Sequence, residues 1–343
     1  MAANNNLKLL PELSETIRNS YNRDFISSFI ESYKSYPSIL VWYTVDEPSI
    51  SSAKFEDVND AYNLIKGLDP NHPVFLLDYG QENLEKYGKA TNILGTDPYP
   101  IPGFPLKRVA DFTNMANQAV AYKKPVWIAI QAHNLANYGS PNGRFPTPRE
   151  EKIMVYLALT HGAKGILYYS FGDVINNEPL WNYLRDLNSE INELSPILLS
   201  GDIEQVVQVS PPPQNNEGIH TLLKKYQNKW YLLAVNSENK NIDASFNIPP
   251  DWPQGLVRVY KENRTIPVVN RQFTESFGAY DTHVYEINSL HGDANIDGRV
   301  DSEDFALLVT DYLKEPVHNT DFNSDGRVDS EDFAILQANY LKQ

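Results

Sequence analysis

The stretch Asp293-Ala-Asn-Ile-Asp-Gly-Arg-Val-Asp-Ser-Glu-Asp304 is followed by a near copy, Asp321-Phe-Asn-Ser-Asp-Gly-Arg-Val-Asp-Ser-Glu-Asp332. In both copies, oxygen-bearing side chains stand at positions 1, 3, 5, 9 and 12, and glycine stands at position 6. Ca²⁺ binds six to eight hard oxygen ligands, and the glycine lets the backbone turn sharply around the ion. Two copies in the same register therefore predict a pair of calcium loops, 293–304 and 321–332.

We expect one Ca²⁺ ion in each loop, because crowded carboxylates repel one another until a cation neutralises them. Residues 292–343 contain 12 acidic and 4 basic side chains, so they carry a net −8 of the chain's −15. The residues expected to hold the two ions are Asp293, Asn295, Asp297, Arg299, Asp301 and Asp304 in the first loop, and Asp321, Asn323, Asp325, Arg327, Asp329 and Asp332 in the second.

Each loop continues into a short apolar segment that predicts a helix, with Phe305 and Leu308 in the first copy and Phe333 and Leu336 in the second. Position 12 is Asp instead of Glu, and no helix is expected before the first loop. With these features, residues 292–343 resemble a type I dockerin, which implies Ca²⁺-dependent folding and binding to a cohesin module. The alternative is that the ions only hold this segment together. The resemblance places cohesin contacts on two equivalent faces, at Ser302, Glu303, Ser330 and Glu331.

The composition limits the remaining possibilities. A chain of 343 residues is expected to hold two or three domains. The net charge of −15 argues against a nucleic-acid partner, and no run of apolar residues is long enough to predict a membrane span. Cysteine is absent, which excludes disulfides and thiol chemistry. Dockerin proteins are exported to cell surfaces or scaffolds, yet the first residues lack the pattern of a signal peptide, so we expect a missing leader or a fragment.

Strands and helices alternate through residues 1–200. Repeated βα units predict a parallel sheet covered by helices, and continuous apolar strands indicate that both faces of the sheet are buried. The segment before Ser38 is expected to be helical. The expected strands are 38–45, 73–77, 92–96, 125–130 and 165–169, and the expected helices lie near 55–65, 81–88, 106–122, 147–161 and 178–192.

Polar and aromatic residues follow each expected strand, at the edge where parallel sheets place their chemistry. This arrangement resembles the second half of a TIM-barrel glycoside hydrolase. The segment ending in Asp46-Glu47-Pro48 resembles the strand of a hydrolase clan whose proton donor is the Glu of an Asn-Glu-Pro motif. The resemblance implies that Glu47 donates the proton. Neighbouring strand residues face opposite ways, so Asp46 and Glu47 cannot both enter one cleft from a regular strand.

Two departures from that clan bear on catalysis. Its nucleophile is a Glu at the end of the seventh strand, but the matching strand here ends in Gln131, whose amide cannot form a glycosyl ester. Three barrel strands are also expected to be absent, although a barrel must close to hide its edges. The chain is therefore either a piece of a longer protein or has an open sheet whose edges are covered in another way.

The candidate catalytic residues are Glu47 and Asp97. Each site candidate also has a purely structural interpretation, because aspartates organise turns and aromatic residues fill cores. The candidate substrate-binding residues are Asp46, Trp42, Asp78, Tyr99, Gln131, His133 and Tyr169.

Short alternating strands replace the βα pattern in residues 201–290 and predict an antiparallel β-sandwich, expected to act as a packing domain. The chain is thus expected to be multidomain: a TIM-barrel-like (β/α) domain, a sandwich, and a small all-α calcium-binding dockerin in residues 291–343. The favoured function is an extracellular glycoside hydrolase that acts on polysaccharide and attaches to a cohesin-bearing scaffold. The rivals are a carbohydrate-binding relative without catalysis, and a protein whose docking tail is its only functional part.

Overall fold

The computed structural model describes residues 7–79, 81–201, 203, 207–227, 229–248, 256–288, 291–295, 299–314, 318, 320–323 and 325–341. The chain divides into two compact units. The first comprises Met1–Thr147 with His161–Trp181, and the second comprises Pro148–Thr160 with Asn182–Gln343. Within the described residues, no helix is both long and apolar enough to cross a membrane. The boundaries expected between domains, near residues 200 and 290, stay a prediction.

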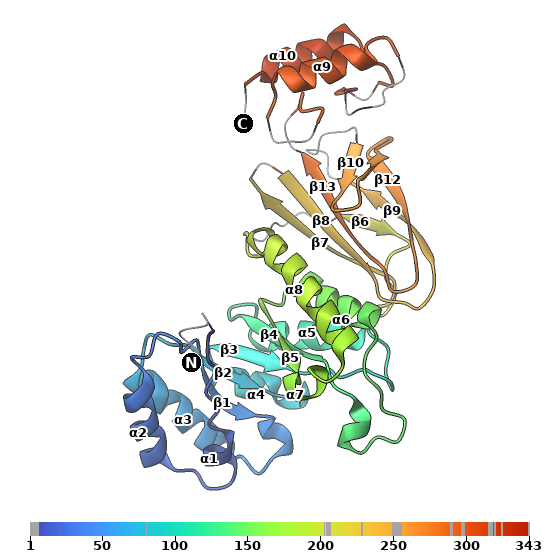
Figure 1. Cartoon of the computed structure of the whole chain (residues 1–343). Helices are drawn as coiled ribbons and strands as arrows, with labels where there is room; N and C mark the ends of the chain where they lie inside the picture. Colours follow the sequence, from blue (N-terminus) through green and yellow to red (C-terminus); the bar gives the residue numbers. More distant parts are fainter. Residues whose placement is uncertain are drawn as a thin grey trace. The chain divides into compact units, whose positions relative to one another are not determined.

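The first unit is built on a five-stranded parallel sheet, in which spatial order follows sequence order (Figure 1). This confirms the predicted parallel architecture. Its strands are β1 (Trp42–Asp46), β2 (Val74–Leu77), β3 (Ile93–Thr96), β4 (Val126–Gln131) and β5 (Gly165–Tyr169). The helices of this unit are α1 (Ser14–Arg18), α2 (Arg23–Tyr33), α3 (Phe55–Leu68), α4 (Leu84–Gly88), α5 (Arg108–Ala119) and α7 (Phe171–Val174), with short 3-10 turns at Pro48–Ile50, Gln81–Asn83 and Leu135–Tyr138.

The segment before β1 is only partly helical, so the prediction for it was partly wrong. Leu9 and Glu12 form parallel bridges with Ile39 and Tyr43. The Tyr43 amide donates to the Pro11 carbonyl at 3.0 Å, and the Leu13 amide donates to the Tyr43 carbonyl at 2.9 Å. Pro11 explains the difference, because a proline disfavours helical backbone at the residue before it. Residues 9–13 are therefore extended and cover the edge of β1.

A cluster of apolar side chains fills one face of this sheet, and glycines make room for its largest rings. A Cβ on Gly95 would lie 2.7 Å from the Phe75 ring, and one on Gly165 would lie 2.5 Å from Trp127. At the far edge, β5 pairs only with β4 among the described strands, and its side chains are half-buried or exposed. The cluster contains Val41, Phe75, Leu77, Ile93 and Ala129, with the partly buried Leu10, Tyr43, Trp127 and Leu167 against it.

The second unit contains two antiparallel sheets that share one apolar core, which confirms the predicted β-sandwich. One sheet has the order β11-β10-β13-β8-β7, and the other has the order β12-β9-β6. The sequence analysis missed β12, a short strand rich in polar residues. The strands are β6 (Gln208–Ser210), β7 (Ile219–Tyr226), β8 (Lys229–Asn236), β9 (Ile242–Asn247), β10 (Leu256–Val259), β11 (Arg264–Pro267), β12 (Gln272–Phe277) and β13 (Thr282–Asn288).

The helices α6 (Pro148–Thr160) and α8 (Glu178–Leu198) precede the sandwich strands in the chain, and α9 (Ser302–Asp311) and α10 (Ser330–Asn339) follow them. Both α9 and α10 begin with capping boxes, in which the N-cap carboxylates of Asp301 and Asp329 accept backbone N–H groups. These two helices are the ones predicted after the calcium loops.

Trp42 is a core residue, which does not agree with its predicted contact to sugar. Its side chain is fully buried. The indole Nε1 donates to the Asp69 carboxylate at 2.8 Å, and His72 Nδ1 lies 2.6 Å from the same oxygen. The ring also packs edge-on against Phe29 of α2. Trp42 therefore lies on the helix-covered face of the sheet.

Replacing Trp42 with Phe should lower the free energy of unfolding by about 1–3 kcal/mol, because the buried Asp69 carboxylate loses one hydrogen-bond donor. Urea unfolding of the purified chain measures the change. Tyr122→Phe alters an exposed ring and is the control, expected to stay within about 0.5 kcal/mol of the parent. Equal stability of Trp42→Phe and the parent would contradict the structural role.

Candidate functional site

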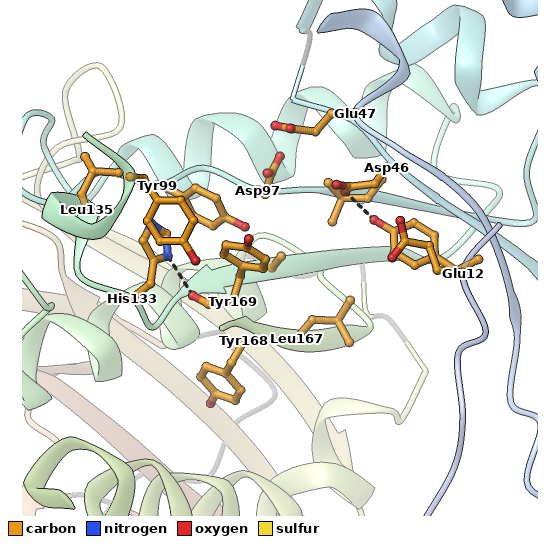
Figure 2. Close-up of a pocket in the computed structure, with 14 residues that line it drawn as sticks. Glu12, Asp46, Glu47, Asp97, Tyr99, His133, Leu135, Leu167, Tyr168 and Tyr169 are labelled. Carbon is orange, nitrogen blue, oxygen red and sulfur yellow. Dashed lines mark hydrogen bonds between the residues drawn. The ribbon is translucent and has the colours of Figure 1, made fainter. Parts of the chain in front are cut away.

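A cavity of about 480 Å³ opens at the carboxyl edge of the parallel sheet (Figure 2). Six of the predicted site residues line it, namely Asp46, Glu47, Asp97, Tyr99, His133 and Tyr169. Its other lining residues are Glu12, Tyr43, Leu77, Ala129, Leu135, Leu167, Tyr138 and Tyr168. The predicted residues Trp42, Asp78 and Gln131 do not line it.

Glu47 enters this cavity because the chain leaves the strand at that residue. Its backbone is left-handed, with φ of 44°, and its amide donates to the Leu77 carbonyl at 2.8 Å. Left-handed backbone is unusual for a residue with a side chain, so neighbouring contacts must hold it. With this bend, Asp46 and Glu47 both line the cavity, which a regular strand would not allow.

Asp78 holds the turn that carries Glu47. Its Oδ1 accepts hydrogen bonds from the Ser49 hydroxyl at 2.6 Å and from the Ser49 amide at 3.2 Å. The Asp78 side chain is fully buried and does not line the cavity. The structure thus gives Asp78 a positioning role in place of the predicted contact with substrate.

Glu47 and Asp97 both line the cavity, and Figure 2 shows their side chains next to each other. Asp97 is 3% exposed. Burial, followed by the negative charge of Glu47, raises the pKa of Asp97 to about 9. Burial also raises the pKa of Glu47, with the Asp46 charge adding to the shift. At neutral pH, Asp97 therefore keeps its proton.

Asp46 is held in a different way, by a cation and a hydroxyl. Arg18 Nη2 lies 3.3 Å from its carboxylate, and the Tyr43 hydroxyl donates to it at 2.5 Å. Burial and the nearby Asp46 charge raise the pKa of Tyr43, so the phenol keeps the proton that it donates. Ser14 Oγ accepts from the Asp46 amide at 2.9 Å. Asp46 is thus fixed in place in the cavity that Glu47 and Asp97 also line.

Aromatic rings form the opposite wall of the cavity. Tyr99 and Tyr169 stack with ring centroids 5.9 Å apart, and His133 lies edge-on to Tyr99 at 4.9 Å. His133 Nδ1 lies 2.9 Å from the Tyr169 carbonyl, so Nδ1 carries the proton and Nε2 is left as an acceptor. Burial lowers the pKa of His133, which favours this neutral form. The wall therefore offers apolar faces and one neutral acceptor.

The sequence analysis missed Glu12 and Tyr138. Glu12 arrives from the extended segment beside β1, and Tyr138 from the turn after β4. The Tyr138 hydroxyl donates to Asp173 at 2.8 Å. Neither residue follows the end of an expected strand. A search for polar and aromatic residues at strand ends, the strand-end rule used in the sequence analysis, therefore could not find them.

Gln131 lies behind the wall and binds backbone. Its Nε2 donates to the Ile101 carbonyl at 2.8 Å, and its Oε1 accepts from the Ile101 amide at 2.9 Å. The side chain is fully buried. Both ends of the amide are therefore engaged, which does not agree with a predicted sugar contact. Gln131 anchors the loop that follows β3.

The two calcium loops lead into equivalent helices in the second unit. Asp304 and Asp332, at position 12, are fully buried, and each accepts backbone N–H groups from the start of its own loop. Leu341 donates to the Val300 carbonyl at 2.7 Å, and Leu313 donates to the Val328 carbonyl at 2.8 Å, so the two copies exchange matching bonds. The shared core contains Ala294, Val300, Leu308, Phe322, Val328 and Leu336.

The donor set of these loops fits Ca²⁺. In the second loop, oxygens of Asp321 and Asn323 accept the amides of Asp325 and Gly326, which aligns hard oxygen ligands along the turn. Asp297 lies outside the described residues, and among those described no three acidic or histidine side chains converge as a ready metal cluster. Calcium loops also take ligands from Asn, backbone carbonyls and water, so this finding is compatible with calcium.

The predicted cohesin contacts Ser302, Glu303, Ser330 and Glu331 are all exposed in the first turns of α9 and α10. Residues 291–341 match the family model described as Dockerin type I domain. Residues 291–341 are a type I dockerin domain. This confirms the resemblance found in the duplicated loops.

Solved structures share the fold of the remainder. A glycoside hydrolase family 5 protein from Bacteroides vulgatus has a TM-score of 0.54 and 15% identity, covering 78% of this chain and 66% of its own. The β-galactosidase of Bacillus circulans sp. alkalophilus has a TM-score of 0.55 and 9% identity, covering 77% and 81%. The α-amylase of Geobacillus thermoleovorans has a TM-score of 0.52 and 12% identity, covering 82% and 71%. At these identities the likeness shows the fold alone, and the comparison with curated protein sequences found no match.

The buried proton of Asp97 should make stability depend on pH. The folded chain keeps the Asp97 proton up to about pH 9, whereas the unfolded chain releases it near 3.8. Between these values the folded state binds more protons, so its free energy of unfolding falls as pH rises, by at most about 1.4 kcal/mol per pH unit.

Asp97→Asn should flatten this decline between pH 5 and 8, as measured by urea unfolding at several pH values. Asp24→Asn, at an exposed position in α2, is the control and should keep the parent's slope. An unchanged slope in Asp97→Asn would show that Asp97 does not hold a buried proton in the folded chain.

Proposed function

We propose that the cavity of the first unit binds a sugar ring and hydrolyses its glycosidic bond, and that the dockerin attaches the chain to a cohesin. The observation that carries the proposal is that Asp46, Glu47 and Asp97 line one cavity opposite an aromatic wall, with Asp97 protonated by burial and Asp46 held by Arg18. A held proton and a separate carboxylate are the two groups that glycoside hydrolysis requires.

In the proposed reaction, Glu47, whose pKa is raised by burial, donates a proton to the glycosidic oxygen as the bond to the anomeric carbon breaks. Asp97 keeps its own proton and stays neutral beside the carboxylate left on Glu47. The Asp46 carboxylate, held by Arg18 and Tyr43, stabilises positive charge on the ring. Water then supplies a hydroxyl to the anomeric carbon, and its remaining proton returns to Glu47.

A second candidate is sugar binding without hydrolysis. Its support is Gln131, which stands at the strand end where the resembled clan carries its nucleophile and whose amide is engaged by Ile101.

Glu47→Gln should separate these candidates, because Gln keeps the shape of the side chain but has no acidic proton. We expect reducing-end release from the active polysaccharide to fall by about 10²–10⁴-fold, with sugar binding retained in calorimetry. Glu85→Gln, at an exposed position in α4, is the matched control and should hydrolyse like the parent. A parent chain that binds sugar without releasing reducing ends would favour the second candidate, and one that does neither would reject the sugar site.

The dockerin resemblance and its family match support a cohesin partner and placement among secreted components of a scaffold. We propose two Ca²⁺ ions, held by side-chain oxygens and by the position-7 carbonyls of Arg299 and Arg327. The acidic side chains proposed as ligands repel one another without the ions, so binding stabilises the folded loops.

Calorimetry of the full chain should count two Ca²⁺ ions, and Asp332→Ala should reduce the count to one, because it removes the buried carboxylate that closes the second loop. Chelation should abolish cohesin binding, and added Ca²⁺ should restore it. Asp243→Ala, in the sandwich, is the control and should keep both ions. Cohesin binding that persists after chelation would contradict calcium-dependent docking.

A further inference from the structure

A second group of aromatic side chains lies in loops at the same carboxyl edge of the sheet as the cavity. Tyr79 follows β2 and is 37% exposed, and Phe104 follows β3 and is 55% exposed. Neither residue lines the cavity. Neither ring takes part in the proposed hydrolysis, although both expose large apolar surfaces.

Arg108, the first residue of α5, lies among these rings. Its guanidinium carbon is 4.3 Å from the centroid of Phe104 and 5.7 Å from that of Tyr79, and its Nη2 donates to the Tyr79 hydroxyl at 2.6 Å. Within the described part of the chain, Arg108 forms no ion pair with a carboxylate. In a protein with 44 acidic residues, a guanidinium held by rings instead of acids keeps N–H donors for a neutral acceptor.

The loop between β3 and α5 connects this group to the cavity. Asp97 and Tyr99 line the cavity from the beginning of the loop. Gln131 then fixes Ile101 through two hydrogen bonds, and the Phe104 amide donates to the Pro100 carbonyl at 2.7 Å. A loop anchored at these points holds Phe104 at a set place relative to Asp97.

We propose that Tyr79, Phe104 and Arg108 form a second sugar subsite, so that the ligand is a neutral glycan chain longer than a single sugar. Exposed aromatic rings cover the apolar face of a sugar ring, while guanidinium N–H groups donate to its hydroxyls. The cavity itself carries the acidic side chains Glu12, Asp46 and Glu47, which repel acidic sugars. This inference rests on the proposed sugar site and extends it along the rim.

The test is chain-length dependence of binding. Xylo-, cello- and manno-oligosaccharides of one to six sugars are titrated into the full chain by calorimetry. For the parent, affinity should rise with chain length in the series that binds. Phe104→Ala should remove that rise, weakening the longest oligosaccharide by about tenfold, while leaving the affinity for the shortest bound sugar unchanged.

Tyr36→Ala is the matched control, because Tyr36 is 56% exposed, close to Phe104, and lies in the connection before β1. It should bind every oligosaccharide like the parent. Arg108→Lys keeps the charge but loses the planar donors, and should weaken only the longer oligosaccharides. Thermal unfolding confirms that each variant is folded.

The outcomes separate the two proposals. If the parent binds sugar but Phe104→Ala and Arg108→Lys bind all lengths like the parent, the second subsite is overturned and the cavity remains a sugar site. If the parent binds none of the three series or any polysaccharide, both proposals fall. Equal loss for short and long sugars in Phe104→Ala would also overturn the subsite, because it would show damage to the cavity itself.

Discussion

The burial of Glu47 and Asp97 in one acidic cavity is the constraint on which the site depends. Two carboxyl groups in one buried cavity cannot both ionise at neutral pH without a large electrostatic cost, and the proton that Asp97 keeps removes one of the two charges. The nearby Asp46 avoids the same conflict because Arg18 balances its charge. The cavity thus holds a proton and a carboxylate side by side at the same pH.

Carboxylates also repel one another in the dockerin, where a different positive charge compensates them. Asp304 and Asp332 are buried at helix starts, where each accepts backbone N–H groups. These donors stabilise single carboxylates, but they do not neutralise the acidic residues gathered in each loop. A divalent cation does, which is why folding and metal binding are expected to be coupled there. Repulsion between carboxyl groups is therefore relieved by a proton in the first unit and by a divalent cation in the second.

The strongest sequence signals were local ones, and these were confirmed. The duplicated loop fixed the dockerin because twelve consecutive residues carry its ligands and its turn. The five strands were found because each is a continuous apolar run. The extended segment 9–13 was missed, since its two bridges to β1 depend on residues about thirty positions later. Glu12 reaches the cavity only through that pairing, so no local sequence pattern predicted its place in the site.

The strand-end rule located the site but could not assign its parts. Asp78, Gln131 and Tyr99 all follow strands, yet only Tyr99 reaches the cavity, because which way a side chain points depends on where the strand stops and how the loop leaves it. Trp42 shows the same limit. When both faces of a sheet are buried, the alternation of side chains along a strand does not tell whether a residue lies on the helix-covered face or on the opposite one.

Asp78 and Gln131 indicate how such a site stays in place. Each is a buried polar side chain that binds the backbone of a loop, at Ser49 and at Ile101. Leaving either backbone group unpaired in the interior would cost about 1–3 kcal/mol, so each anchor resists movement of its loop. One loop carries Glu47 and the other carries Asp97. The two anchors therefore fix the loops that place both carboxyl groups in the cavity, and loss of either anchor would let its carboxyl group move toward water and ionise more readily.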